Sequence, residues 1–65
     1  MNWDYVESNW DKLKGKLRSK WAKLTDDDIQ NIKGKRDVLA GKLRERYAYA
    51  KDRVDKDIDD WLAGL

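Results

Sequence analysis

Three consecutive aspartates, Asp26 to Asp28, are the residues whose type and spacing could most readily do chemistry in this chain. They follow Thr25 in the segment KLTDDDIQNIKGKRD, where lysines and an arginine come after the acidic run. Carboxylates in a row could bind a metal ion, could form a catalytic acid–base pair, or could begin a helix. The neighbouring residues distinguish these alternatives.

A metal site fits this segment poorly. Adjacent side chains on a helix point about 100° apart, so three aspartates in a row do not converge on one ion. In a calcium loop that begins at Asp26, the sixth position requires a glycine and the last a glutamate. The chain has Asn31 and Asp37 at those positions. We therefore expect neither a metal site nor a cofactor.

The same residues fit the start of a helix. Thr25 is a good N-cap, and Asp28, three residues later, completes a variant of the capping box. Negative charge in the first turn interacts favourably with the helix dipole. Gly34 is well placed to end the helix after Lys33. The segment predicts a short helix over residues 26 to 33.

The composition argues against an enzyme. The 65 residues include no histidine and no cysteine, which removes the commonest general base and any thiolate nucleophile or metal ligand. A chain of this length forms one domain, residues 1–65, whose core is hardly large enough for a catalytic cleft. We expect a non-enzymatic protein without catalytic residues.

The chain also lacks the signals of export and membrane insertion. It has no charged start followed by an apolar run, and no window approaches the roughly 20 apolar residues of a membrane span. Charged residues make up 43% of the chain, although the net charge is only +2. These features predict a cytoplasmic protein.

Apolar residues at steps of three and four predict a helix before the aspartates. Asn9 is a good N-cap for this helix, and the short run from Trp3 to Glu7, capped by Asn2, predicts an extra turn or helix at the start. The apolar stripe consists of Trp10, Leu13, Leu17, Trp21 and Leu24.

A second stripe continues with a period close to 11 residues and no phase break. Since Ala48 and Ala50 are strong helix formers and proline is absent, the pattern favours one long helix from about 36 to 63. Two helices broken between Tyr47 and Lys51 are the alternative. The stripe consists of Leu39, Leu43, Tyr47, Ala50, Val54, Ile58, Trp61 and Leu65.

The chain contains an internal repeat. Residues 11–22, DKLKGKLRSKWA, align with residues 37–48, DVLAGKLRERYA, and seven of the twelve positions are identical. Two copies predict a pair of related helical hairpins that cover each other. Gly15 and Gly41 fall at equivalent places in mid-helix, where small residues predict close approach by another helix. Access of a phosphate or a partner to the backbone, and simple tolerance of glycine, are the alternatives.

Six cations in the two repeat copies are the candidate contacts for a nucleic acid or a protein partner. They could bind phosphates, with tryptophan for stacking, or they could lie on solvated helix faces that pair with neighbouring acidic residues. Four aspartates among the last eleven residues favour intramolecular pairing. The six cations are Lys16, Arg18, Lys20, Lys42, Arg44 and Arg46.

Two further features suggest contacts. Asp59 and Asp60 lie near a helix C-terminus, where the helix dipole disfavours them, so a basic surface within or outside the chain would explain them. Three of the four tryptophans fit the core stripes, whereas Trp3 could be a surface anchor.

The segment from Asn9 to Asp52, with Trp61 beyond it, resembles the CsbD-like family of small bacterial stress-induced proteins. The shared features are the Asn–Trp start, the KGK triplet, TDDD, GKRD and ERY. The resemblance implies a cytoplasmic bacterial protein produced under general stress. It also implies an all-α fold of about four helices, arranged as two hairpins packed crosswise. It implies no catalytic activity, cofactor or binding residue.

The chain departs from the family pattern at Ala22 and Ala48, where the pattern has glycine. Glycine at the second position would favour a break before the last helix, so a continuous, rearranged or domain-swapped C-terminal helix stays open. We expect a stress-response protein that acts by abundance or by binding a macromolecule, as a monomer or homodimer. The alternative is weak phosphate-directed binding of nucleic acid.

Overall fold

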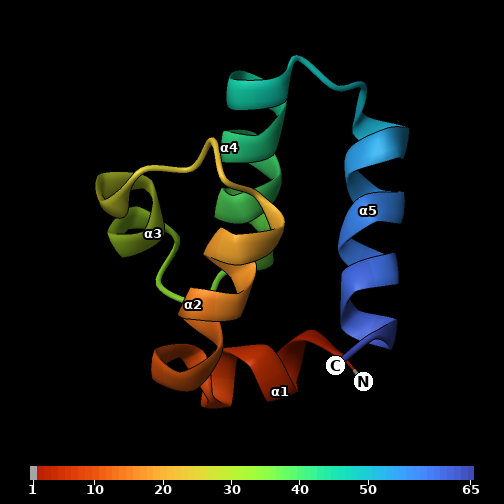
Figure 1. The fold of residues 1–65 in the computed structure, drawn as a ribbon. Helices are drawn as coiled ribbons and strands as arrows, with labels where there is room; N and C mark the ends of the chain where they lie inside the picture. The colour runs from red at the N-terminus through yellow and green to blue at the C-terminus, as the bar shows by residue number, and fades with distance from the viewer. Residues whose placement is uncertain (1) are drawn as a thin grey trace.

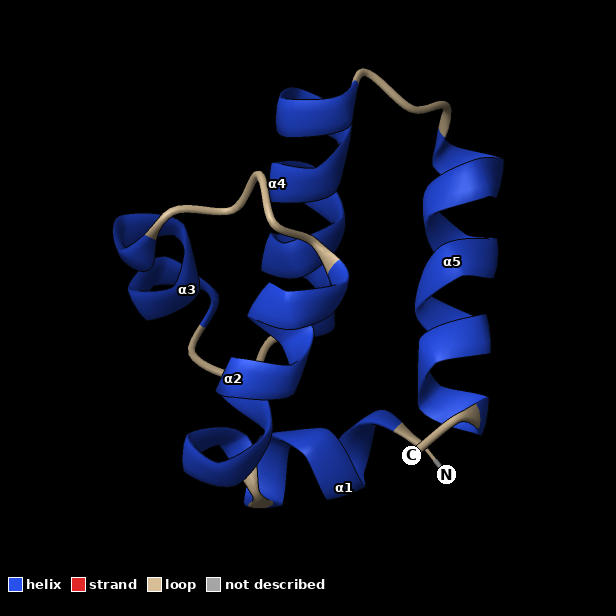
Figure 2. Ribbon diagram, viewed as in Figure 1, coloured by secondary structure: helices blue, strands red, loops and turns tan. Residues whose placement is uncertain are grey.

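The computed structural model describes residues 2–65, and every regular element in that range is an α-helix (Figures 1 and 2). The predicted all-α bundle is thus confirmed. Among these residues, no helix combines the length and apolar character that crossing a membrane requires. The helices are α1 (Trp3–Ser8), α2 (Trp10–Lys20), α3 (Asp26–Ile32), α4 (Arg36–Tyr47) and α5 (Lys51–Ala63).

The count is five helices instead of about four because the predicted extra turn is a separate helix, α1. The Asn2 side chain accepts a hydrogen bond from the amide of Tyr5 at 3.3 Å, as expected of an N-cap. Asn9 separates α1 from α2, but its side chain does not cap α2. It donates instead to the carbonyl of Tyr5 at 2.9 Å.

The helix α2 is shorter than its apolar stripe. It ends at Lys20, and Trp21 leaves the helical conformation at φ −119° and ψ 81°. Both Trp21 and Leu24 are nonetheless buried, so the stripe correctly predicts the core residues but not the last turn of helix. The indole of Trp21 packs against that of Trp61, with ring centroids 5.6 Å apart.

The start of α3 is the predicted capping box. The Thr25 hydroxyl accepts from the amide of Asp28, and the Asp28 carboxylate accepts from the amide of Thr25, both at 3.1 Å. The helix ends one residue earlier than predicted, because Lys33 is already left-handed at φ 49°. Gly34 follows at φ 78°, a conformation that glycine adopts without a Cβ penalty.

The prediction of one long helix from about 36 to 63 is wrong. Ala48 takes the left-handed conformation at φ 55° and ψ 32°, and α4 and α5 run side by side as an antiparallel hairpin (Figure 1). The reason is burial, since a straight helix would leave much of its apolar stripe in water. The hairpin buries Leu43 of α4 and Val54 of α5 completely.

All five helices contribute to one core. Four of its residues lie outside the two predicted stripes, although Leu62 follows Ile58 at the helical spacing of four. These four are Val6, Ile29, Ile32 and Leu62. The buried apolar residues are Val6, Leu13, Leu17, Trp21, Leu24, Ile29, Ile32, Leu39, Leu43, Val54, Ile58 and Leu62.

The tryptophan at the start of the chain is not a surface anchor. Trp3 is half-buried, and its indole N–H donates to the carbonyl of Gly34. Its ring also lies against Trp61, with centroids 6.3 Å apart. Trp3 therefore joins α1 to both the α3–α4 turn and α5. Figure 1 shows α1 lying across the lower ends of α2 and α5.

The two mid-helix glycines do not mark a close helix–helix contact. A Cβ atom built on Gly15 or Gly41 would meet nothing within 4 Å beyond the helix itself. The prediction of close packing there is wrong, because the small-residue side of each helix faces open space instead of a neighbour.

We expect Gly15→Ala and Gly41→Ala each to stabilise the protein by about 0.5 to 1 kcal/mol, because alanine is less flexible in the unfolded chain and fits without strain. Gly34→Ala is the matched control. Its Cβ would lie 3.2 Å from the backbone of Glu7 at a positive φ, so we expect a loss of at least about 1 kcal/mol. Urea unfolding followed by circular dichroism measures all three. A loss of stability at Gly15 or Gly41 would contradict the open geometry.

Candidate functional site

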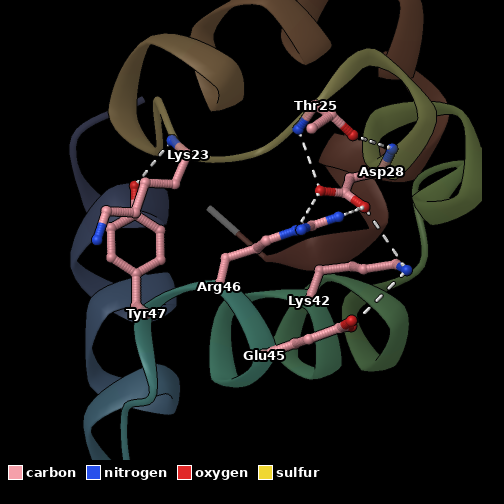
Figure 3. A network of polar contacts seen from close by, with 7 residues as sticks. All are labelled: Lys23, Thr25, Asp28, Lys42, Glu45, Arg46 and Tyr47. Carbon is pink, nitrogen blue, oxygen red and sulfur yellow. Dashed lines mark hydrogen bonds and ion pairs between the residues drawn. The ribbon is translucent and has the colours of Figure 1, made fainter.

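One charged side chain, Asp28, is buried among the described residues, and it organises the main polar cluster (Figure 3). Arg46 of α4 binds it with two hydrogen bonds, from Nε to Oδ2 at 2.9 Å and from Nη2 to Oδ1 at 3.1 Å. The Nζ of Lys42 lies 3.6 Å from Oδ1. Lys42 and Arg46 reach the same carboxylate because residues four apart share one face of a helix.

The carboxylate of Asp28 thus serves two structural purposes. Within its own helix it completes the capping box with Thr25. Across the helix interface it receives the planar guanidinium of Arg46 in the bidentate geometry that arginine favours. The acidic start of α3 is thereby fixed to the middle and end of α4.

The electrostatic surroundings keep Asp28 ionised. Hydrogen bonds from Arg46 and from the backbone of Thr25 hold the pKa of Asp28 well below its usual range, although burial alone would raise it. The carboxylate in turn raises the pKa of Arg46. A general acid at neutral pH needs a pKa shifted upward, so this arrangement suits a structural ion pair and not proton transfer.

The neighbouring aspartates point elsewhere. Asp26 forms an ion pair with Arg18 of α2, and Asp27 is exposed. The three carboxylates therefore do not meet. Within residues 2–65, no three acidic side chains are placed to hold a metal ion together.

The six predicted cations do not form one surface. Three of them pair with aspartates of α3, as expected of helix faces that pair with acidic neighbours. These are Arg18 with Asp26, and Lys42 and Arg46 with Asp28. Lys16 and Lys20 lie on α2 toward the end of α5, whereas Arg44 is exposed on α4. The role of the six cations as contacts for a partner stays a prediction.

Lys16 and Lys20 border an open hollow between α2 and the C-terminal end of α5. No ion pair engages either lysine in the part of the chain that the structure describes. The hollow combines two exposed ammonium groups with part of an indole ring. Its lining residues are Lys16, Lys20, Asp60, Trp61, Gly64 and Leu65.

The two aspartates near the end of α5 have cations of the chain nearby. The carboxylate of Asp59 lies 2.9 Å from the guanidinium of Arg36 at the start of α4. Asp60 lines the same hollow as Lys16 and Lys20. Arg36 thus offsets the unfavourable interaction of Asp59 with the helix dipole. Asp60 forms no ion pair within residues 2–65.

A second polar–aromatic group, which the sequence interpretation missed, covers the α4–α5 turn. Tyr47 and Tyr49 stack with centroids 5.2 Å apart. Lys23 lies over Tyr47 at 5.1 Å, and Arg53 lies over Tyr49 at 3.9 Å, both within cation–π range. Helical spacing gives no signal for this contact, because Tyr49 lies outside α5, before its N-cap Ala50. Cations on both sides leave these rings less free to stack with a ligand.

We expect Asp28→Asn to lower the free energy of unfolding by about 1 to 3 kcal/mol at pH 7, because an amide cannot accept the bidentate pair of Arg46. The ionised carboxylate stabilises the fold above the pKa of an unfolded aspartate, and its contribution fades as pH falls. The difference between wild type and variant should therefore be constant near neutrality and shrink below about pH 4.

Asp27→Asn provides the matched control, since it removes the same charge from the same turn at an exposed position. Chemical unfolding at several pH values between 2 and 7 measures both variants. Equal effects of the two substitutions, or a difference that grows on acidification, would contradict the assigned role of Asp28.

Comparison with known proteins places the chain among bacterial relatives of similar length. The CsbD-like family pattern matches residues 4–56. A UPF0337 protein of Rhodopseudomonas palustris is 58% identical over 65 residues, which cover 100% of this chain and 98% of that protein. The UPF0337 protein YjbJ of Escherichia coli K12 is 52% identical over 61 residues, 94% of this chain and 88% of the relative. The chain therefore belongs to the CsbD-like family.

Proposed function

We propose that this protein is a non-enzymatic, cytoplasmic component of the bacterial stress response that acts by binding another macromolecule. The observation that carries the non-enzymatic part of the proposal is the structural role of Asp28. The buried carboxylate is held ionised between Thr25 and Arg46, so it stabilises the fold and is not poised for acid–base chemistry. Membership of the CsbD-like family supports the role in stress.

The surface offers a place for such a partner. Lys16 and Lys20 are exposed and project beside Trp61, which is half-buried. An indole with nearby ammonium groups suits an anionic partner that also presents apolar surface. We propose this hollow as the contact region, because its cations are not engaged in ion pairs of the described chain.

Nucleic acid is a weaker candidate for the partner. Arg18, Lys42 and Arg46 are engaged with aspartates, and their release would cost the fold its links between α3 and its neighbours. Of the six predicted cations, only Lys16, Lys20 and Arg44 would thus remain for a phosphate-binding surface.

The stress role is tested in a strain that lacks its own CsbD-like protein. We expect reduced survival under osmotic, heat or stationary-phase challenge, and expect this chain to restore it. The double variant Lys16→Glu/Lys20→Glu should fold normally and fail to restore survival, because it reverses the charge of the hollow. Colony counts after each challenge measure the effect.

Lys51→Glu/Lys56→Glu is the matched control, since it makes the same charge change at exposed positions of α5. This variant should restore survival. If both double variants restore it equally, binding at the hollow is wrong, and an effect of abundance fits better. A deletion strain indistinguishable from its parent would count against the stress role itself.

The nucleic-acid alternative has a separate test. If the protein bound nucleic acid through phosphates, counterion release would make the association detectable at about 50 mM salt and steeply weaker as salt rises. We expect instead that fluorescence anisotropy with labelled oligonucleotides detects no association. Salt-dependent association that Lys16→Glu/Lys20→Glu abolishes would instead make nucleic acid the partner.

A further inference from the structure

The turn between α4 and α5 holds an alanine in a conformation that disfavours it. Ala48 has φ 55° and ψ 32°, where the Cβ atom of an L-residue crowds the following carbonyl oxygen. Glycine would adopt this conformation without that penalty. The side chain of Ala48 is exposed, so no core contact compensates locally for the unfavourable backbone.

The helix ends at this turn are weakly capped as well. The last bond of α4 runs from the amide of Ala48 to the carbonyl of Arg44, and the first bond into α5 runs from Val54 to Ala50. Ala50 stands at the N-cap and makes no side-chain hydrogen bond. A continuous helix would give each amide from 49 to 53 an intrahelical acceptor.

The sequence across the turn is equally suited to a continuous helix. Residues 48 to 50 are Ala, Tyr and Ala, and both alanines are strong helix formers. The apolar stripe from Leu39 to Leu65 keeps its phase through these residues. Local structure therefore favours a straight α4–α5 helix, whereas burial of the stripe favours the hairpin.

A second copy of the chain can satisfy both preferences at once. We propose that two copies exchange α5, so that α4 and α5 of each copy form one continuous helix and each α5 packs on the α4 of the other copy. The α4–α5 core contacts re-form between copies, as does the ion pair between Arg36 and Asp59. Such an exchange gives a closed two-fold dimer.

One group of contacts opposes the exchange. Tyr47 and Tyr49 stack in the hairpin, and Arg53 covers the second ring. Residues two apart point in different directions on a helix, so the exchanged dimer loses this stack. The tyrosine stack therefore favours the monomeric hairpin, whereas the left-handed Ala48 favours the exchanged dimer. Substitutions at the two places should shift the monomer–dimer equilibrium in opposite directions.

The test uses the full chain, unfolded and refolded at low concentration and at about 1 mM, where a second copy competes with intramolecular closure. Light scattering after size exclusion measures the dimer fraction. In a dimer refolded from a mixture of isotope-labelled and unlabelled chains, filtered NOEs should connect α4 of one copy to α5 of the other. The chemical shifts of residues 48–50 should become helical.

Variants at the turn make the result specific. Ala48→Gly should weaken dimerisation by at least about 100-fold, because glycine relieves the hairpin and penalises the helix in both copies. Tyr49→Ala should strengthen it by at least about tenfold, through loss of the stack. Ala40→Gly is the control in the interior of α4, and should leave the dimer fraction unchanged, since α4 is helical in both forms.

A chain that stays monomeric at about 1 mM after refolding, even with Tyr49→Ala, would overturn the proposal. A dimer whose α4–α5 contacts are intramolecular would overturn it too. So would an Ala48→Gly variant that dimerises as well as wild type.

Discussion

The ion pair between Asp28 and Arg46 links the start of helix α3 to the packing of α3 on α4. Within α3, the carboxylate completes the capping box that starts a helix of only seven residues, which would be marginal on its own. Between helices, both oxygens of the same carboxylate accept hydrogen bonds from the guanidinium of Arg46 in α4. Loss of this carboxylate therefore weakens the helix and its attachment together, and the apolar packing of Ile29 and Ile32 depends on both.

The second constraint is the competition between local and tertiary preference at Ala48. Backbone propensity favours a helix through this residue, but a small chain must bury most of its apolar stripe to be stable. Folding back at Ala48 buries Leu43 and Val54 fully, and the gain from burial exceeds the cost of one left-handed alanine. The stack of Tyr47 on Tyr49 supports the turn from outside the core.

The cations of the two repeat copies have different surroundings in the fold. Arg18, Lys42 and Arg46 form ion pairs with two of the aspartates at the start of α3, so these three cations contribute to the fold itself. Lys16 and Lys20 belong to the same sequence repeat as Arg18 but face the end of α5. Equivalent positions in the repeat thus have different surroundings, because α3 and α5, which follow the two copies, differ in length and placement.

The sequence by itself determined the all-α class, the capping box at Thr25 and most of the core, because caps and apolar periods act over a few residues. It also predicted that cations would pair with acidic neighbours, though not that Asp28 would be buried between Thr25 and Arg46. Only the tertiary structure decided that pairing, the open space around Gly41 and the turn at Ala48. Each depends on which helix faces which, and burial across the whole chain, not local propensity, sets that arrangement.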